Sequence, residues 1–457
     1  MAVDATIEMM SKVPSSARGW PVLLSLGLTL MLGGCGSGGG GSSGQAGAGG
    51  HIGSGGAGGA GGGQGGFAGG GGHAGFAGGG GAAGGGQLGG GGEIGGAAGG
   101  GQVGGSSGTT DGGAGAGGMG CPVADGGTTP AVLPDSVSFV PNVTVSTVAG
   151  GASATGFVNP VGIALEPGGT SLVVSDFDNN ELDRVTLTGT ITALTSQSNF
   201  SRPYALAFDP ARTVLYSQTD ADPSGAHDHA TTSTIWIINR GSGAASVLAA
   251  DVGYTRGIAV LSDGRLVLAD RGSHLIRLLD PTTGATSVLA GSAACIGGVD
   301  GTGAGAEFSD PYGVAVLPGD TIVVADYLLR VLRKVTLAGV VTTFAGDGGP
   351  AASIDGPALS ARFIRPQAVA ADSNGVVYVS DTGASRIRRI GTDGTVSTLA
   401  GDGTIGFMDG TGAMAEFAGA EGIAVSANGS TVYVADGDDG ADTPLPYNRV
   451  RAITIGP

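Results

Sequence analysis

Beyond residue 170 the chain repeats one pattern of apolar and polar positions six times. Each copy is a short run, rich in β-branched and other apolar residues, that ends at an aspartate. The last three of these aspartates, Asp326, Asp381 and Asp436, are evenly spaced, and a period of about 50 residues indicates stacked copies of one supersecondary unit. The six runs are residues 172–176, 214–220, 266–270, 322–326, 376–381 and 432–436.

Each copy divides into four predicted β-strands, of which the aspartate run is the second. The fifth copy shows the division clearly, with strands at 368–371, 376–381, 387–390 and 396–399. Runs of β-branched residues favour strands, and the glycine, aspartate and asparagine between them supply turn geometry. The second copy departs most, because an insertion at 221–233 follows its aspartate, which is displaced to Asp220.

The sixth copy lacks its fourth strand, and a matching segment lies at the other end of the repeats. Residues 143–150 read Val-Thr-Val-Ser-Thr-Val-Ala-Gly, similar to Thr-Val-Ser-Thr-Leu-Ala-Gly at 395–401. A ring of sheets needs its first and last members joined, since open sheet edges would otherwise stay exposed. The sequence therefore predicts an all-β fold, a six-bladed β-propeller at 135–457, with the N-terminal strand closing the last blade.

Several phrases of the repeat resemble the NHL repeat of six-bladed propellers. They are residues 311–316 (Pro-Tyr-Gly-Val-Ala-Val), 376–389 and 396–401, together with the linker phrase at 300–308 and its echoes at 355–363 and 409–417. The resemblance spans the whole predicted propeller and is strongest after residue 257. It implies a six-bladed fold that hosts binding modules as well as enzymes, so it does not assign an activity.

The N-terminus is typical of an exported protein. Two basic residues precede an apolar run at 20–32, which is too short for a membrane span of about 20 residues and fits a signal-peptide core. The run ends in Leu-Gly-Gly-Cys at 32–35, which resembles a bacterial lipobox and implies lipidation of Cys35. Residues 1–35 are thus a predicted lipoprotein signal peptide. Because Gly36 rather than aspartate follows, we expect anchoring in the cell envelope, at the outer membrane or cell surface.

Glycine makes up 98 of the 457 residues and is concentrated between the lipobox and residue 120. Such a stretch lacks the apolar side chains that offset the entropy of ordering the backbone, so residues 36–134 are predicted to form a disordered tether. Export also permits a disulfide between Cys121 and Cys295, with two unpaired thiols as the alternative.

The net charge of −17 disfavours nucleic acid as a partner, because nucleic-acid binding needs a basic face. Acidity of this size favours solubility. We expect a monomer that contacts the membrane through its lipid anchor.

The position just before each first strand of a blade should lie around the mouth of the central channel. A small polar ligand or peptide would meet two aromatic rings, a cation, an amide and an acid there. Ordinary solvated turn residues are the alternative for any one of them. The six equivalent positions are Val161, Tyr204, Arg256, Tyr312, Gln367 and Glu421.

The repeated aspartates invite a calcium interpretation, but one per blade cannot converge on one ion. We expect each to accept backbone N–H bonds in the turn between the second and third strands. Arginine recurs on the third strand, where it indicates packing between blades or solvation. These recurring arginines are Arg277, Arg333, Arg388 and Arg451.

The favoured interpretation is a tethered lipoprotein whose propeller is a non-catalytic binding module for a protein, peptide or glycan at the envelope. The alternative is a metal-assisted hydrolase or lyase of small molecules, with a divalent cation at the channel mouth. Glu421 is similar to the acidic metal ligand of lactonase-like propellers, but its asparagine and aspartate partners are not identifiable. No catalytic residue, metal ligand or cofactor is therefore assigned.

Overall fold

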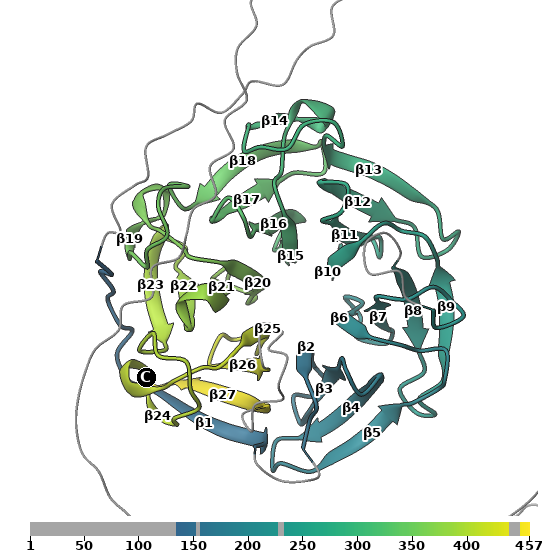
Figure 1. The fold of residues 1–457 in the computed structure, drawn as a ribbon, viewed down its shortest axis with the longest axis horizontal. Helices are drawn as coiled ribbons and strands as arrows, with labels where there is room; N and C mark the ends of the chain where they lie inside the picture. The colour runs from purple at the N-terminus through teal and green to yellow at the C-terminus, as the bar shows by residue number, and fades with distance from the viewer. Residues whose placement is uncertain (1–133, 152–155, 227–232, 438–447) are drawn as a thin grey trace, which may run out of the picture. The chain divides into compact units, whose positions relative to one another are not determined.

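Six β-sheets stand around a central axis like the blades of a propeller (Figure 1). The structure is a computed structural model, and it describes residues 134–151, 156–226, 233–437 and 448–457. We number the blades 1 to 6 in chain order of their innermost strands. The all-β, six-bladed prediction is confirmed.

Blades 1 to 3 are four-stranded antiparallel sheets, in which the strands follow one another from the axis outward. Blade 1 holds β2 (Pro160–Leu165), β3 (Ser171–Asp176), β4 (Glu181–Thr186) and β5 (Ile191–Thr195). Blade 2 holds β6 (Pro203–Phe208), β7 (Leu215–Thr219), β8 (Thr234–Ile238) and β9 (Ala245–Ala249). Blade 3 holds β10 (Thr255–Val260), β11 (Leu266–Asp270), β12 (Leu275–Leu279) and β13 (Thr286–Gly291).

Blades 4 to 6 have five strands, because a two-residue strand from the preceding linker pairs with the outer edge. Blade 4 holds β14 (Gly301–Thr302), β15 (Pro311–Leu317), β16 (Thr321–Asp326), β17 (Val331–Val335) and β18 (Val340–Ala345). Blade 5 holds β19 (Gly356–Pro357), β20 (Pro366–Ala371), β21 (Val377–Asp381), β22 (Arg386–Ile390) and β23 (Thr395–Ala400). Blade 6 holds β24 (Gly410–Thr411), β25 (Ala420–Val425), β26 (Thr431–Asp436), β27 (Arg449–Ile455) and β1 (Val143–Gly150).

The ring closes where the earliest and latest strands of the propeller meet. Strand β1 pairs antiparallel with β27 from Val143 opposite Ile455 to Gly150 opposite Arg449. Figure 1 shows β1 along the outer edge of blade 6, beside the last strand of the chain. The predicted closure by the segment at 143–150 is therefore confirmed.

The linker phrases form structure that the sequence did not predict. Beyond β14, β19 and β24, each phrase folds into a single 3-10 turn: η1 (Gly303–Gly305), η2 (Ala358–Ser360) and η4 (Gly412–Met414). A fourth 3-10 turn, η3 (Thr382–Ala384), follows the aspartate of blade 5. Among the described residues, no helix is long and apolar enough to cross a membrane.

The apolar core lies between neighbouring blades, because both faces of each sheet are covered. One cluster joins blade 3 to blade 4 through residues such as Ile276, Phe308 and Val324, all with no exposed surface. Near the axis the blades come closest: a Cβ on Gly162 would lie 1.9 Å from the carbonyl oxygen of Tyr204 in the next blade. A side chain does not fit at Gly162, and this close approach brings the preceding residue, Val161, to the channel.

Blade 2 corrects one detail of the predicted register. Pro203 pairs with Thr219, as Pro160 pairs with Asp176 in blade 1. Thr219 rather than Asp220 therefore occupies the repeated aspartate position, because β7 ends one residue earlier than the apolar run suggested.

Candidate ligand-binding site at the channel mouth

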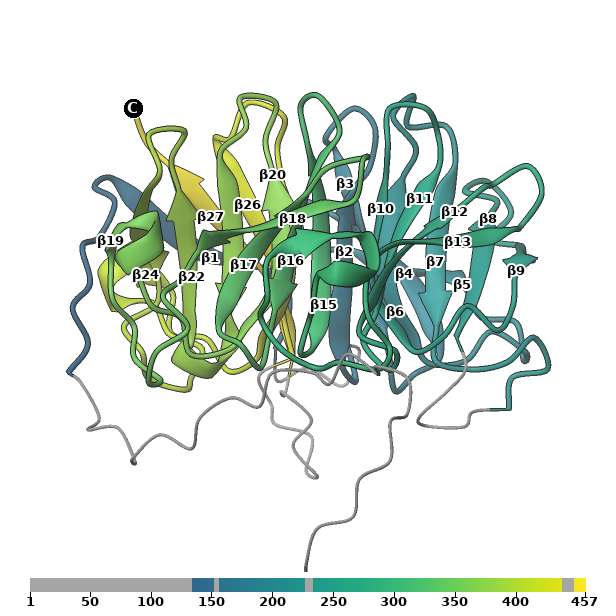
Figure 2. The ribbon, with the colours of Figure 1, turned by 90° about the horizontal axis from the view of Figure 1, so that it is seen from above.

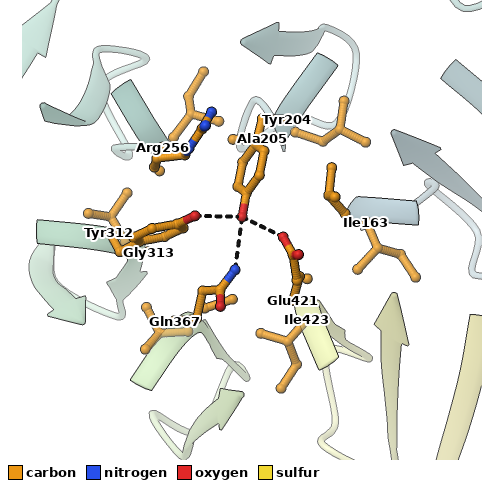
Figure 3. Close-up of a pocket in the computed structure, with 18 residues that line it drawn as sticks. Ile163, Tyr204, Ala205, Arg256, Tyr312, Gly313, Gln367, Glu421 and Ile423 are labelled. Atoms are coloured by element: carbon orange, nitrogen blue, oxygen red, sulfur yellow. Dashed lines mark hydrogen bonds between the residues drawn. The ribbon is translucent and has the colours of Figure 1, made fainter. Parts of the chain in front are cut away.

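The six predicted ring residues lie on the innermost strands, each at the second position of its strand. Figure 3 shows Tyr204, Arg256, Tyr312, Gln367 and Glu421 around one pocket, which Val161 also lines. Five of the six are buried, including Arg256 at 9% and Glu421 at 8% exposed. The alternative that they are solvated turn residues is wrong, because neighbouring strands pack against them.

The Tyr204 hydroxyl is the centre of the ring. It donates to Glu421 Oε2 at 2.6 Å and accepts from Gln367 Nε2 at 2.9 Å, and it lies 3.0 Å from the Tyr312 hydroxyl. Figure 3 shows the three bonds meeting at this oxygen. Four blades are thus linked across the channel through one phenol.

Burial keeps both tyrosines of the ring protonated. Burial and the negative charge of Glu421 raise the pKa of Tyr204 well above its usual value. Burial likewise raises the pKa of Tyr312 to about 12, although Arg256 acts in the opposite direction. The phenols therefore stay neutral hydrogen-bonding groups at any physiological pH.

Arg256 supplies the positive charge of the ring. It forms a buried ion pair with Asp220, donates to the Tyr254 hydroxyl at 2.5 Å and lies 4.3 Å from the centre of the Tyr204 ring. Burial alone would lower the pKa of Arg256, but Asp220 and the tyrosines raise it above its usual value. The guanidinium is fixed and always charged.

The ring forms a floor between two cavities. The cavity on the channel side measures about 90 Å³ and runs along the innermost strands. The cavity on the mouth side measures about 240 Å³, and we call it the mouth pocket. Beyond the ring residues, the mouth pocket is lined by Asn159, Phe177, Arg202, Arg271 and Tyr327.

Aromatic rings and arginines alternate around the mouth pocket. Tyr312 stacks on Tyr327 with ring centres 5.4 Å apart, and Phe177 meets Tyr204 edge to face at 5.8 Å. Arg202 lies 4.4 Å from the centre of the Phe177 ring, and Arg271 lies 4.9 Å from that of Tyr312. Arrangements of this kind hold the arginines by cation–π attraction while leaving planar surface for a ligand.

Sequence reasoning missed the residues of this outer layer, although a signal for three of them was present. Phe177, Arg271 and Tyr327 each directly follow the repeated aspartate of their blade. The connection between second and third strands begins there, and it shares a face with the linker before the first strand (Figure 2). The residue after the aspartate is therefore a second position that faces the mouth.

The repeated aspartates are structural, but most of their backbone partners lie before the first strand and not in the predicted turn. Asp326 accepts the N–H groups of Ser309 and Asp310, both at 2.9 Å, just before β15. The corresponding bonds of Asp176 and Asp436 also go to the residues before the first strand. The aspartates thus fix the linkers that enter the blades, and Asp270 also accepts the N–H of Ser273 at 3.2 Å in the following turn, as predicted.

The repeated arginines of blades 4 to 6 are buried, so the prediction that they are solvated is wrong, whereas packing beside the core between blades remains. Each guanidinium has no exposed surface, bonds an aspartate from the linker phrase of its own blade and lies 5.1–5.4 Å from a phenylalanine ring. We call each such cluster an arginine brace. The braces are Arg333 with Asp300 and Phe308, Arg388 with Asp355 and Phe363, and Arg451 with Asp409 and Phe417.

Two predictions concern cysteines. Cys295 is disulfide-bonded. Its predicted partner Cys121 lies outside the described residues, as do Cys35 and the whole predicted signal peptide, so the pairing and the lipidation stay predictions.

Comparison with known proteins supports the repeat and the fold. Residues 363–390 match the family model of the NHL repeat. A structure of a protein of unknown function from Bacteroides thetaiotaomicron is similar, with a TM-score of 0.55 and 18% identity over 68% of this chain and 76% of that one. An auxiliary nutrient binding protein from the same organism has a TM-score of 0.54 and 16% identity over the same shares. No curated protein sequence matches.

Proposed function

We propose that this six-bladed NHL-repeat propeller is a non-catalytic binding module, which holds a small polar ligand in the mouth pocket. The ligand is a glycan or the end of a peptide chain with an anionic group. The module acts as a monomer, displayed at the cell envelope by a lipid on Cys35 and the glycine-rich segment at 36–134.

One observation carries the ligand class: the mouth pocket combines flat aromatic surface with arginines. Arg202 makes no ion pair with any described residue and its Nε has no hydrogen-bond partner among them, whereas Arg271 is held by Asp310 through two bonds of 2.8 Å. In a chain of net charge −17, positive groups gathered over aromatic rings favour a ligand that carries a carboxylate or similar anion. Sugar rings and peptide groups stack on such aromatic faces.

The fixed floor supports binding more than chemistry. Among the six ring positions Glu421 is the one carboxylate, and none is histidine. A catalytic divalent cation needs several converging oxygen or nitrogen ligands. The metal-assisted hydrolase or lyase is therefore the weaker hypothesis. Binding roles are known on this architecture, since one structural neighbour is named as an auxiliary nutrient binding protein, although that likeness concerns the fold alone.

The test screens the full-length protein against neutral and acidic oligosaccharides and short peptides, and quantifies the hits by calorimetry. We expect acidic ligands to bind, and Arg202→Gln or Tyr327→Ala to weaken that binding at least tenfold, about 1.4 kcal/mol. The matched control is Arg265→Gln, because Arg265 pairs with Asp263 in the turn between the first two strands of blade 3. A hit that binds both mouth variants as tightly as the wild type would place the ligand elsewhere. Turnover of a hit, seen by mass spectrometry, would favour the enzyme alternative.

A further inference from the structure

One position of the repeat carries a different residue class in blade 1. The position lies on the third strand of each blade. Its residue pairs with the second-strand residue that comes two places before the repeated aspartate position, as Asp183 pairs with Val174 in blade 1. Four blades place arginine there and blade 2 places tryptophan, whereas blade 1 places an acid. The six residues in blade order are Asp183, Trp236, Arg277, Arg333, Arg388 and Arg451.

In the other blades this residue complements the group at the aspartate position. Arg277 bonds Asp270 at 2.8 Å, and Arg451 bonds Asp436 at 2.9 Å. Blade 2 replaces both members, and Trp236 Nε1 donates to the Thr219 hydroxyl at 2.8 Å. A buried carboxylate is thus met by a guanidinium, or both charges are absent.

Blade 1 keeps the aspartate but has no such partner. The carboxylates of Asp176, Glu181 and Asp183 offer oxygens that all lie within 4.8 Å of one another. Asp183 is only 3% exposed, and it makes no hydrogen bond or ion pair with any residue that the structure describes. Burial, and then the charges of Glu181 and Asp176, raise the pKa of Asp183 to about 7. A buried acid of this kind is costly unless a positive charge meets it.

We propose that blade 1 binds a divalent cation of the calcium class between Asp176, Glu181 and Asp183, at the place where blades 3 to 6 hold a guanidinium. This site is separate from the ring of the mouth and goes beyond the proposed ligand binding. The cation would tie the start of β4 to the end of β3, and so fix the connection that carries Phe177 of the mouth pocket.

The oxygen spacing fits calcium, because three oxygens within 4.8 Å of one another can all contact one such ion. Calcium binds oxygens at about 2.3–2.6 Å, so two ligands on opposite sides of the ion are about 5 Å apart. Zinc would prefer nitrogen or sulfur ligands, which this cluster does not offer. Half-buried Glu181 leaves one side open for the water molecules that complete the coordination of calcium.

The test uses the full-length protein, stripped with EDTA, and measures ⁴⁵Ca²⁺ binding by equilibrium dialysis together with thermal melting. We expect the wild type to bind about one Ca²⁺ and to melt at a higher temperature with Ca²⁺ than with EDTA, because an ion that binds only the native state stabilises it. Asp183→Asn should bind at least tenfold more weakly. The matched control, exposed Asp251→Asn, should bind like the wild type.

Asp183→Arg sharpens the test, because it installs the guanidinium of the other blades. This variant should melt higher than the wild type in EDTA and should not respond to Ca²⁺. Should Asp183→Asn or Asp183→Arg fail to fold, Glu181→Gln at the edge of the cluster must show the same tenfold loss of Ca²⁺ binding. The proposal is overturned if the wild type binds less than 0.1 Ca²⁺ per chain at about 1 mM, or if the folded variants of the cluster bind as tightly as the control.

Discussion

Blades 1 and 5 place side chains of opposite charge at the same position of the same strand. In blade 5, Arg388 lies between two aspartates, Asp355 and Asp381, and has no exposed surface. In blade 1, Asp183 lies against two further carboxylates at an equally buried point. The repeat thus determines the position of the side chain, whereas the residues that compensate its charge differ from blade to blade.

The difference follows from the linkers that enter the blades. Blades 4 to 6 are preceded by long linkers that contain the phrase beginning with Asp300, Asp355 or Asp409. This aspartate bonds the arginine and also accepts a backbone N–H from the strand beside it, as Asp300 does from Thr343 of β18 at 3.1 Å. Blade 1 has no such linker phrase. A brace therefore satisfies its charges within the chain, whereas the acids of blade 1 require a cation from solution.

Removing the arginine of a brace should have the largest effect. Arg388→Ala leaves Asp381 buried without its positive partner, and we expect the free energy of unfolding to fall by about 3–5 kcal/mol. Urea denaturation followed by circular dichroism measures the change. The control is Arg389→Ala, one residue along and half-buried, which should cost well under half as much. An equal loss in both variants would mean that the brace contributes no specific stability.

Replacing the buried acid of one brace should cost more stability than replacing the exposed acid of another. The side chain of Asp355 is 4% exposed and that of Asp300 is 48% exposed, although each bonds the arginine of its blade. We expect Asp355→Asn to cost about 3 kcal/mol and Asp300→Asn about 1 kcal/mol, because water screens the exposed pair. The same denaturation experiment measures both. Similar values for the two variants would contradict this ranking.

Much of the fold follows from local pattern, and the exceptions have physical causes. Runs of β-branched residues, separated by turn residues, predicted the four strands of each blade to within a few residues, because these signals lie within each strand and its adjoining turns. The two-residue strands β14, β19 and β24 were missed, because so short a segment pairs only after tertiary packing places it at a sheet edge. The closing strand was found because its sequence repeats that of β23.

The candidate site was predicted in part, because its residues share one position of the repeat. Ring residues such as Tyr204 and Glu421 occupy one repeat position, and a closed ring brings equivalent positions together. Their hydrogen bonds through a single phenol could not be predicted, since they depend on side-chain conformations across the channel. The arginines were expected to pack between blades or to be solvated, and their bonds to the linker aspartates were missed. Nothing local shows that Asp355 returns to Arg388, although the two phrases recur together. Asp183 could be noticed in the sequence only as an acid at the position where blades 3 to 6 carry arginine.

Blade 2 tests whether a neutral pair can take the place of a charged one. Trp236→Phe removes the bond to Thr219 and leaves its hydroxyl oxygen buried without that donor, while the ring still packs against Phe200. We expect a loss of about 2 kcal/mol, smaller than for Arg388→Ala, because no charge is left uncompensated. Denaturation in urea again measures the effect. A loss as large as that of the brace variant would show that packing, rather than charge, dominates this position.

Alkaline pH should separate the braces from the floor of the mouth. Arginine and aspartate do not titrate between pH 9 and 11, whereas tyrosine in the unfolded chain ionises near pH 10. The pKa of Tyr312 is raised to about 12 in the folded protein, so the native state holds more protons in this range and stability falls as pH rises. We expect Tyr312 to account for about 1 kcal/mol of the stability lost between pH 9 and 11. Between pH 9 and 11, the free energy of unfolding of Tyr312→Phe should fall by about 1 kcal/mol less than that of the wild type. The pH dependence of Asp300→Asn should match that of the wild type. Parallel curves for the wild type and Tyr312→Phe would mean that the floor opens to water before it titrates.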